Sequence, residues 1–130
     1  MRGSKTGKYR SKLEARVAEL IPDAEYESNK LKYTIPASKH TYLTDFKIGP
    51  DSYIEVKGYL KASERKKYLL VRDANPEITL RFFFDKADNK IYKGSPTTYA
   101  AWCEAHGFEW TDLKRGLPAE WTNYKNQKER

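Results

Sequence analysis

The fold is decided by the stretch TDFKIGPDSYIEVKG, residues 44–58, in which a turn separates two short apolar runs. Asp45 lies on the first run, and Glu55 and Lys57 lie on the second. Between the runs, residues 48–52 contain the glycine and proline that are typical of a hairpin turn. The stretch therefore predicts two antiparallel strands that bring their acidic residues to neighbouring positions.

Alternation along the second strand places its polar side chains on one face. Glu55 and Lys57 are two positions apart and therefore point the same way. Ile54 and Val56 alternate with them and face the core. The hairpin returns Asp45 to the side of Glu55, and carboxylates are the hard oxygen ligands that Mg²⁺ prefers. The same pattern also fits an exposed polar face on an edge strand, so the spacing alone leaves both interpretations open.

Composition limits the class of protein. The chain has 130 residues, 38% of them hydrophobic, which suits a single globular domain with its own core. Lysine and arginine number 25 against 18 acidic residues, and the net charge of +7 favours a polyanionic partner. The single cysteine, Cys103, excludes an internal disulfide framework and is typical of a reducing compartment. Because no run approaches the ~20 apolar residues of a membrane helix, we expect a soluble, intracellular protein.

We divide the chain into a flexible basic arm at residues 1–10, one domain at 11–122 and a polar tail at 123–130. The arm and the residues that follow it carry basic side chains and no acid before Glu14. These basic residues are Arg2, Lys5, Lys8, Arg10 and Lys12. Such a segment fits a solvated tail as well as an arm that lies along a phosphate backbone.

The sequence of the domain predicts alternating helices and strands. Ser11 is a helix cap, with Leu13 and Val17 at helical spacing after it and Pro22 as the stop. The further elements we expect are an extended segment at about 24–44, a helix at 64–74 capped by Ser63, a strand at 78–84, a short strand at 90–93 and a helix capped by Ser95 that runs from Pro96 to His106.

Two groups of charged residues on the expected helices have more than one interpretation. Glu14 follows Ser11 at capping-box spacing, which predicts a bond from Glu14 back to the Ser11 amide. On the second helix, Arg65, Lys66 and Lys67 form a basic side that could contact phosphates.

Several segments resemble the bacteriophage endonuclease I family, whose members are junction-resolving nucleases of the restriction-endonuclease-like superfamily. The matching segments are RSKLE at 10–14, IPAS at 35–38, HTY at 40–42, DF at 45–46, EVKG at 55–58, RKK at 65–67, YKGSPT at 92–97 and LPAEW at 117–121. They cover nearly the whole chain. The segments at 92–97 and 117–121 have no evident catalytic role, so shared nuclease chemistry alone would not produce them.

The resemblance implies an α/β fold with an αβββαβ core and a mixed sheet, in an intertwined, segment-swapped homodimer bridged by residues 24–44. It moves Glu14 from a cap to the active site, where Glu14 of one chain would join residues of the other. The catalytic residues that it implies are Glu14, Asp45, Glu55 and Lys57. It also implies Mg²⁺, with Mn²⁺ as a second choice, held by Glu14, Asp45, Glu55 and the carbonyl oxygen of Val56.

The implied function is cleavage of four-way (Holliday) junctions and branched DNA, by two-metal hydrolysis, in the cytoplasm of an infected bacterium. The chain departs from the family at its C-terminal end, where the basic residues are reduced to Lys125, Lys128 and Arg130. Two alternatives stay open. One is a nuclease of the same fold that acts on linear or mismatched duplex, and the other is a non-catalytic DNA-binding protein whose acids are structural.

Overall fold

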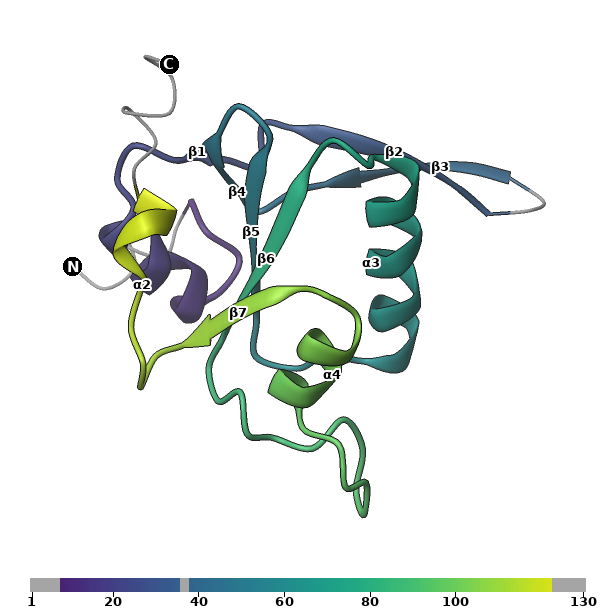
Figure 1. Ribbon diagram of the computed structural model, residues 1–130. Helices are drawn as coiled ribbons and strands as arrows, with labels where there is room; N and C mark the ends of the chain where they lie inside the picture. Colours follow the sequence, from purple (N-terminus) through teal and green to yellow (C-terminus); the bar gives the residue numbers. More distant parts are fainter. Residues whose placement is uncertain (1–7, 36–37, 123–130) are drawn as a thin grey trace.

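The computed structural model describes residues 8–35 and 38–122, which form a mixed α/β fold (Figure 1). Its helices are α2 (Lys12–Leu20), α3 (Ala62–Ala74), α4 (Tyr99–Ala105) and the 3-10 helix η1 (Ala119–Thr122). Its strands are β1 (Glu25–Tyr26), β2 (Lys30–Ile35), β3 (Ser38–Leu43), β4 (Phe46–Gly49), β5 (Ser52–Lys57), β6 (Thr79–Phe84) and β7 (Glu109–Asp112). Within the described residues, no helix is both long and apolar enough to cross a membrane.

The main sheet has five strands in the order β1-β4-β5-β6-β7 and mixes both strand directions. β1, β4 and β5 pair antiparallel, which confirms the hairpin predicted around residues 48–52. β5, β6 and β7 are parallel, since α3 and α4 each return the chain to the starting edge of the sheet. The predicted α/β class, with a mixed sheet, is confirmed.

β2 and β3 form a separate antiparallel pair that runs from Lys30↔Leu43 to Ile35↔Ser38. The amide of Thr44 donates to the carbonyl oxygen of Asn29 at 2.9 Å and closes the base of this hairpin. Figure 1 shows the hairpin passing α3 and projecting beyond it. Within the segment predicted to be an extended bridge, β2 and β3 are thus extended, and in the single chain they pair with each other.

Side chains of the central strands are buried on both faces of the sheet. Tyr53 and Phe82 pack in one apolar cluster with residues of α3 and α4. Ile54 and Phe83 pack in a second cluster with Trp121 of η1 and residues of α2. Figure 1 shows these helices on opposite faces of the sheet. The alternation predicted for the second strand is confirmed, and Ile54 does face a core.

β5 lies between β4 and β6, which decides between the two interpretations of its polar residues. Glu55 is only 1% exposed, because it lies on a strand whose side chains are buried on both faces. The interpretation of Glu55 as part of an exposed polar face on an edge strand is therefore wrong. A buried carboxylate on a central strand requires partners, which the fold supplies.

The starts of two helices differ from the prediction. α3 begins at Ala62 after an extended Lys61, so Ser63 lies inside the first turn and does not cap the helix. α4 begins at Tyr99, where the Thr98 hydroxyl accepts from the Ala101 amide at 3.0 Å. Ser95 does not cap it, because its hydroxyl accepts from the Thr97 amide and stabilises a local turn.

The strands also differ from the prediction at two places, where one expected strand is missing and one unexpected strand is present. Residues 90–93 contribute only an isolated bridge between Lys90 and Thr98, and not the expected strand. β7 was not predicted, since it has only four residues and pairs with β6, a partner distant in sequence. Its register places Trp110 opposite Phe82, so β7 completes the parallel half of the sheet.

Replacement of Phe83 tests whether the second cluster supports the fold. Phe83 is fully buried between the sheet and η1, so we expect Phe83→Ala to lower the free energy of unfolding by about 3–5 kcal/mol. Tyr59→Ala is the control, because Tyr59 is 75% exposed and its loss should cost less than about 0.5 kcal/mol. Urea unfolding measures both. Equal losses in the two variants would contradict the packing described.

Candidate active site

Asp45 and Glu55 are held by each other's strand. The Asp45 amide donates to Glu55 Oε2 at 3.0 Å, and the Val56 amide donates to Asp45 Oδ2 at 2.9 Å. Both carboxylates are buried, with Asp45 just before β4 and Glu55 within β5. The second oxygen of Glu55, Oε1, accepts from the Tyr68 hydroxyl at 3.4 Å. The hairpin therefore fixes the two acids predicted to be metal ligands side by side.

Burial makes both carboxylates weaker acids than usual. It raises the pKa of Asp45 to about 6, helped by the charge of Glu14 and opposed by the Val56 amide bond. It raises the pKa of Glu55 to about 8, against the Asp45 amide bond and the charge of Lys57. Burial disfavours the charged form of each carboxyl group even with Arg10 and Lys57 nearby, and a divalent cation would stabilise that form.

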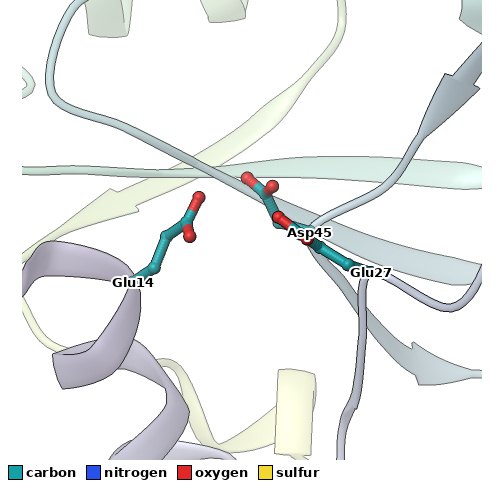
Figure 2. Close-up of side chains that lie close together, drawn as sticks. All are labelled: Glu14, Glu27 and Asp45. Atoms are coloured by element: carbon teal, nitrogen blue, oxygen red, sulfur yellow. The ribbon is translucent and has the colours of Figure 1, made fainter. Parts of the chain in front are cut away.

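Glu14 turns from α2 toward Asp45, as Figure 2 shows. Its side chain does not bond the Ser11 amide as predicted. Glu14 Oε1 instead accepts from the Arg10 amide at 3.0 Å and from the Tyr26 hydroxyl at 2.6 Å. The cap itself is as predicted, because the Ser11 hydroxyl accepts from the Glu14 amide. With Arg10 as its backbone partner, the carboxylate of Glu14 stays on the side of the helix that faces Asp45.

Glu27 joins the site and was missed by the sequence analysis. Its carboxylate, with those of Glu14 and Asp45, offers oxygens that all lie within 4.8 Å of one another (Figure 2). The backbone directs it there, because the Glu27 amide donates to the Asp45 carbonyl oxygen at 3.0 Å. These three acids offer the oxygen ligands that Mg²⁺ and Mn²⁺ prefer, and together they could hold such an ion.

Arg10 supplies the positive charge of this cluster. Its Nε lies 2.7 Å from Glu27 Oε2, and its Nη2 lies 3.4 Å from Asp45 Oδ1 and 4.0 Å from Glu14 Oε2. The contact with Glu27 is ionic but poorly aligned, since Glu27 Oε2 has no hydrogen-bond partner among the described residues. The Arg10 side chain is 68% exposed, so it reaches these buried acids from the solvent side. Arg10 was predicted to contact DNA, and in the free protein it is the counter-ion of these three acids.

Lys57 lies at the end of β5 beside the two acids. Its Nζ is 2.8 Å from Glu64 Oε2, so the ammonium is paired with the first turn of α3. Burial raises the pKa of Glu64, but the bond and charge of Lys57 outweigh it and the net shift is downward. Glu64 is therefore an anion next to Lys57.

The residues predicted to contact DNA occupy different environments. Arg2 and Lys5 lie outside the described residues, and Lys8, Lys12 and Lys66 are exposed. Arg65 is turned inward, where its Nη1 donates to the carbonyl oxygens of Leu60 at 2.7 Å and Ile91 at 3.3 Å. Lys67 is half-buried on the side of α3 that faces Lys57. Arg65, Lys66 and Lys67 therefore lie in three different environments and do not form one continuous basic surface on α3.

Comparison with known proteins gives consistent matches. A family model described as phage endonuclease I matches residues 1–129. Endonuclease I of Escherichia phage T7 is 42% identical over 121 residues, which are 90% of this chain and 80% of the relative. Endodeoxyribonuclease 1 of Enterobacteria phage T3 is 40% identical over 108 residues, covering 80% of this chain and 71% of the relative.

The raised pKa of Glu55 predicts how the metal-free protein responds to pH. The folded state holds this proton from the ordinary value of 4.5 up to about 8, whereas the unfolded chain releases it at the lower value. The folded state binds more protons in that window, so stability falls as pH rises through it. Because glutamine cannot ionise, Glu55→Gln should lose less stability than the wild type between about pH 5 and about pH 9.

Urea unfolding at the two pH values, with a chelator present, measures this difference. Glu77→Gln is the matched control, since Glu77 is exposed and precedes β6. Identical pH slopes for the wild type and Glu55→Gln would show that the Glu55 carboxyl is not protonated in the folded state.

Proposed function

The chain belongs to the phage endonuclease I family, and from this membership we propose that it is a Mg²⁺-dependent endonuclease that cleaves four-way (Holliday) junctions and other branched DNA. The observation that carries the proposal is the meeting of Asp45, Glu55 and Lys57 at the carboxyl end of β5. The names of the two relatives, an endonuclease and an endodeoxyribonuclease, support DNA as the substrate. The net charge of +7 supports it as well.

The buried acids argue against a protein that only binds DNA. Asp45 and Glu55 are desolvated at a cost in stability, and near a phosphate backbone their charges would repel. A cation bound between the acids and the phosphate would attract both, so the two buried carboxylates would then favour DNA binding and not oppose it. The remaining alternative, a nuclease of the same fold that acts on linear or mismatched duplex, differs in substrate geometry and needs a direct assay.

Each residue has a distinct role in the proposed reaction. Glu14, Asp45, Glu55 and the Val56 carbonyl oxygen would together hold the divalent cations of a two-metal site. When bound, such cations lower the pKa of an attacking water and stabilise the charge that develops on the phosphate and the leaving oxygen. Glu27 lies in the same cluster and is a further candidate ligand.

Lys57 would act through its charge. Its ammonium forms an ion pair with Glu64 at 2.8 Å. A protonated lysine is not a base, so Lys57 would orient the water or offset charge on the pentacovalent phosphate. Loss of Lys57 should therefore reduce turnover more than binding.

We also propose a homodimer in which the N-terminal segment is exchanged. In the single chain, α2 and β1 bring Glu14 to Asp45 of the same chain. Residues 29–44 form a hairpin that is closed at its base by the Thr44–Asn29 bond. If this hairpin opened, α2 and β1 could make the same contacts with a second chain, and each site would combine Glu14 of one chain with Asp45 of the other.

Substitution of the acids tests the site. Asp45→Asn and Glu55→Gln should abolish Mg²⁺-dependent cleavage of an immobile four-way junction, because each removes a ligand charge. Junction binding should persist, since less negative charge then faces the phosphates. Glu77→Gln is again the control and should cleave like the wild type.

The assay is run with and without Mg²⁺ on a junction, a linear duplex and a mismatched duplex. Cleavage by Asp45→Asn at the wild-type rate would remove Asp45 from the site, and equal cleavage of junction and linear duplex would remove the preference for branched DNA.

A mixed dimer tests the exchange. Glu14→Ala and Glu55→Ala chains should each be inactive, and their heterodimer should contain one intact site if sites are shared. That heterodimer would nick one strand of a junction without making the paired cuts that resolve it. If each chain builds its own site, both sites carry one lesion and the confirmed heterodimer cuts nothing, which rejects the exchange but not the nuclease.

A further inference from the structure

A polar pocket of about 250 Å³ lies beside Lys57 on the face of the sheet covered by α3. Its lining includes Arg10, Tyr42, Glu55, Lys57, Glu64 and Lys67. Three of these side chains are cationic at neutral pH, and two are acidic. The pocket opens next to the proposed metal ligands, so its occupant would lie beside the reacting centre.

Lys67 has no anionic partner there. Its Nζ lies 4.7 Å from the centre of the Tyr42 ring and 5.2 Å from that of the Tyr68 ring. Among the described residues it makes no hydrogen bond or ion pair, although the side chain is half-buried. Contacts with aromatic faces offset only part of the cost of removing an ammonium group from water.

The nearby acids are already engaged. Glu64 is paired with Lys57, whose own Nζ lies 5.5 Å from the Tyr68 ring that also faces Lys67. Glu55 accepts from the Asp45 amide through Oε2 and from the Tyr68 hydroxyl through Oε1. Two ammonium groups thus approach one aromatic ring and one pocket, and Glu64 forms an ion pair with Lys57 but not with Lys67.

We propose that this pocket receives the phosphate group of the DNA strand being cleaved, and that Lys67 donates to a non-bridging oxygen of that phosphate alongside Lys57. This inference rests on the proposed nuclease function. An entering phosphate supplies the anion that Lys67 lacks, and it competes with Glu64 for Lys57. In the free protein, the Glu64 carboxylate is the anion that pairs with Lys57, and the phosphate would replace it in this role.

Lys66 provides a matched control. It is the neighbour of Lys67 on α3 and has the same charge, but it is exposed and does not line the pocket. Lys67→Gln and Lys66→Gln therefore change the net charge equally. Long-range attraction to DNA should fall by a similar amount in both variants.

The first measurement is single-turnover cleavage of a four-way junction in Mg²⁺, with enzyme at saturating concentration. Lys67→Gln should slow cleavage by roughly one to two powers of ten, as expected for one lost charge-assisted hydrogen bond. Lys66→Gln changes an expected DNA contact outside the pocket, so it should weaken junction binding and slow saturated cleavage much less than Lys67→Gln does. Lys67→Met, which keeps an apolar stem over Tyr42 and Tyr68, should behave like Lys67→Gln.

The second measurement needs no catalysis. Inorganic phosphate should raise the melting temperature of metal-free wild type and Lys66→Gln, and should raise that of Lys67→Gln less.

If the wild type cleaves no DNA, the proposed function fails, and the phosphate measurement still tests the pocket. If the wild type cleaves and the Lys66 and Lys67 variants match in both assays, the inference is wrong. Unfolding of both Lys67 variants without phosphate would also overturn it, since Lys67 would then be structural.

Discussion

The reciprocal bonds between Asp45 and Glu55 are the constraint on which the rest of the site depends. Each carboxylate accepts an amide from the opposite strand, so the register of β4 and β5 cannot change without stranding a buried charge. Both bonds use one oxygen of each acid and direct the other oxygen to a different neighbour. The β4–β5 hairpin therefore sets the fold and the chemistry through the same pair of contacts.

Opposite charges meet on the two sides of this pair. Arg10 offsets part of the charge of Glu14, Glu27 and Asp45, whereas Lys57 is paired with Glu64. Both balancing groups lie at the edge of the site, and both have charges that a metal ion or a phosphate could replace. In the free protein, Arg10 lies beside the acids and Glu64 lies beside Lys57, where the proposed ligands would bring charges of the same sign.

Prediction from sequence succeeded where local patterns decide the structure. Alternation and turn residues indicated the hairpin of Asp45 and Glu55, and helical spacing with Ser11 indicated α2. It failed where distant pairing decides. Glu27 reaches the site only because Tyr26 pairs with Phe46, and nothing near Glu27 in the sequence indicates that register. The start of α4 was missed because Ser95 has a local amide to bond, and a cap pattern cannot show which amide is used.

β1 has only two residues, yet it joins α2 to the sheet. A segment attached through so short a strand is expected to open locally at a lower free energy than the central strands, and its amides should exchange hydrogen sooner. Glu14 and Glu27 both travel with this segment, while Asp45 and Glu55 stay with the central hairpin. One local opening would thus remove two carboxylates at once, so the occupancy of the complete acid cluster follows the local stability of residues 8–27 and not the global stability of the fold.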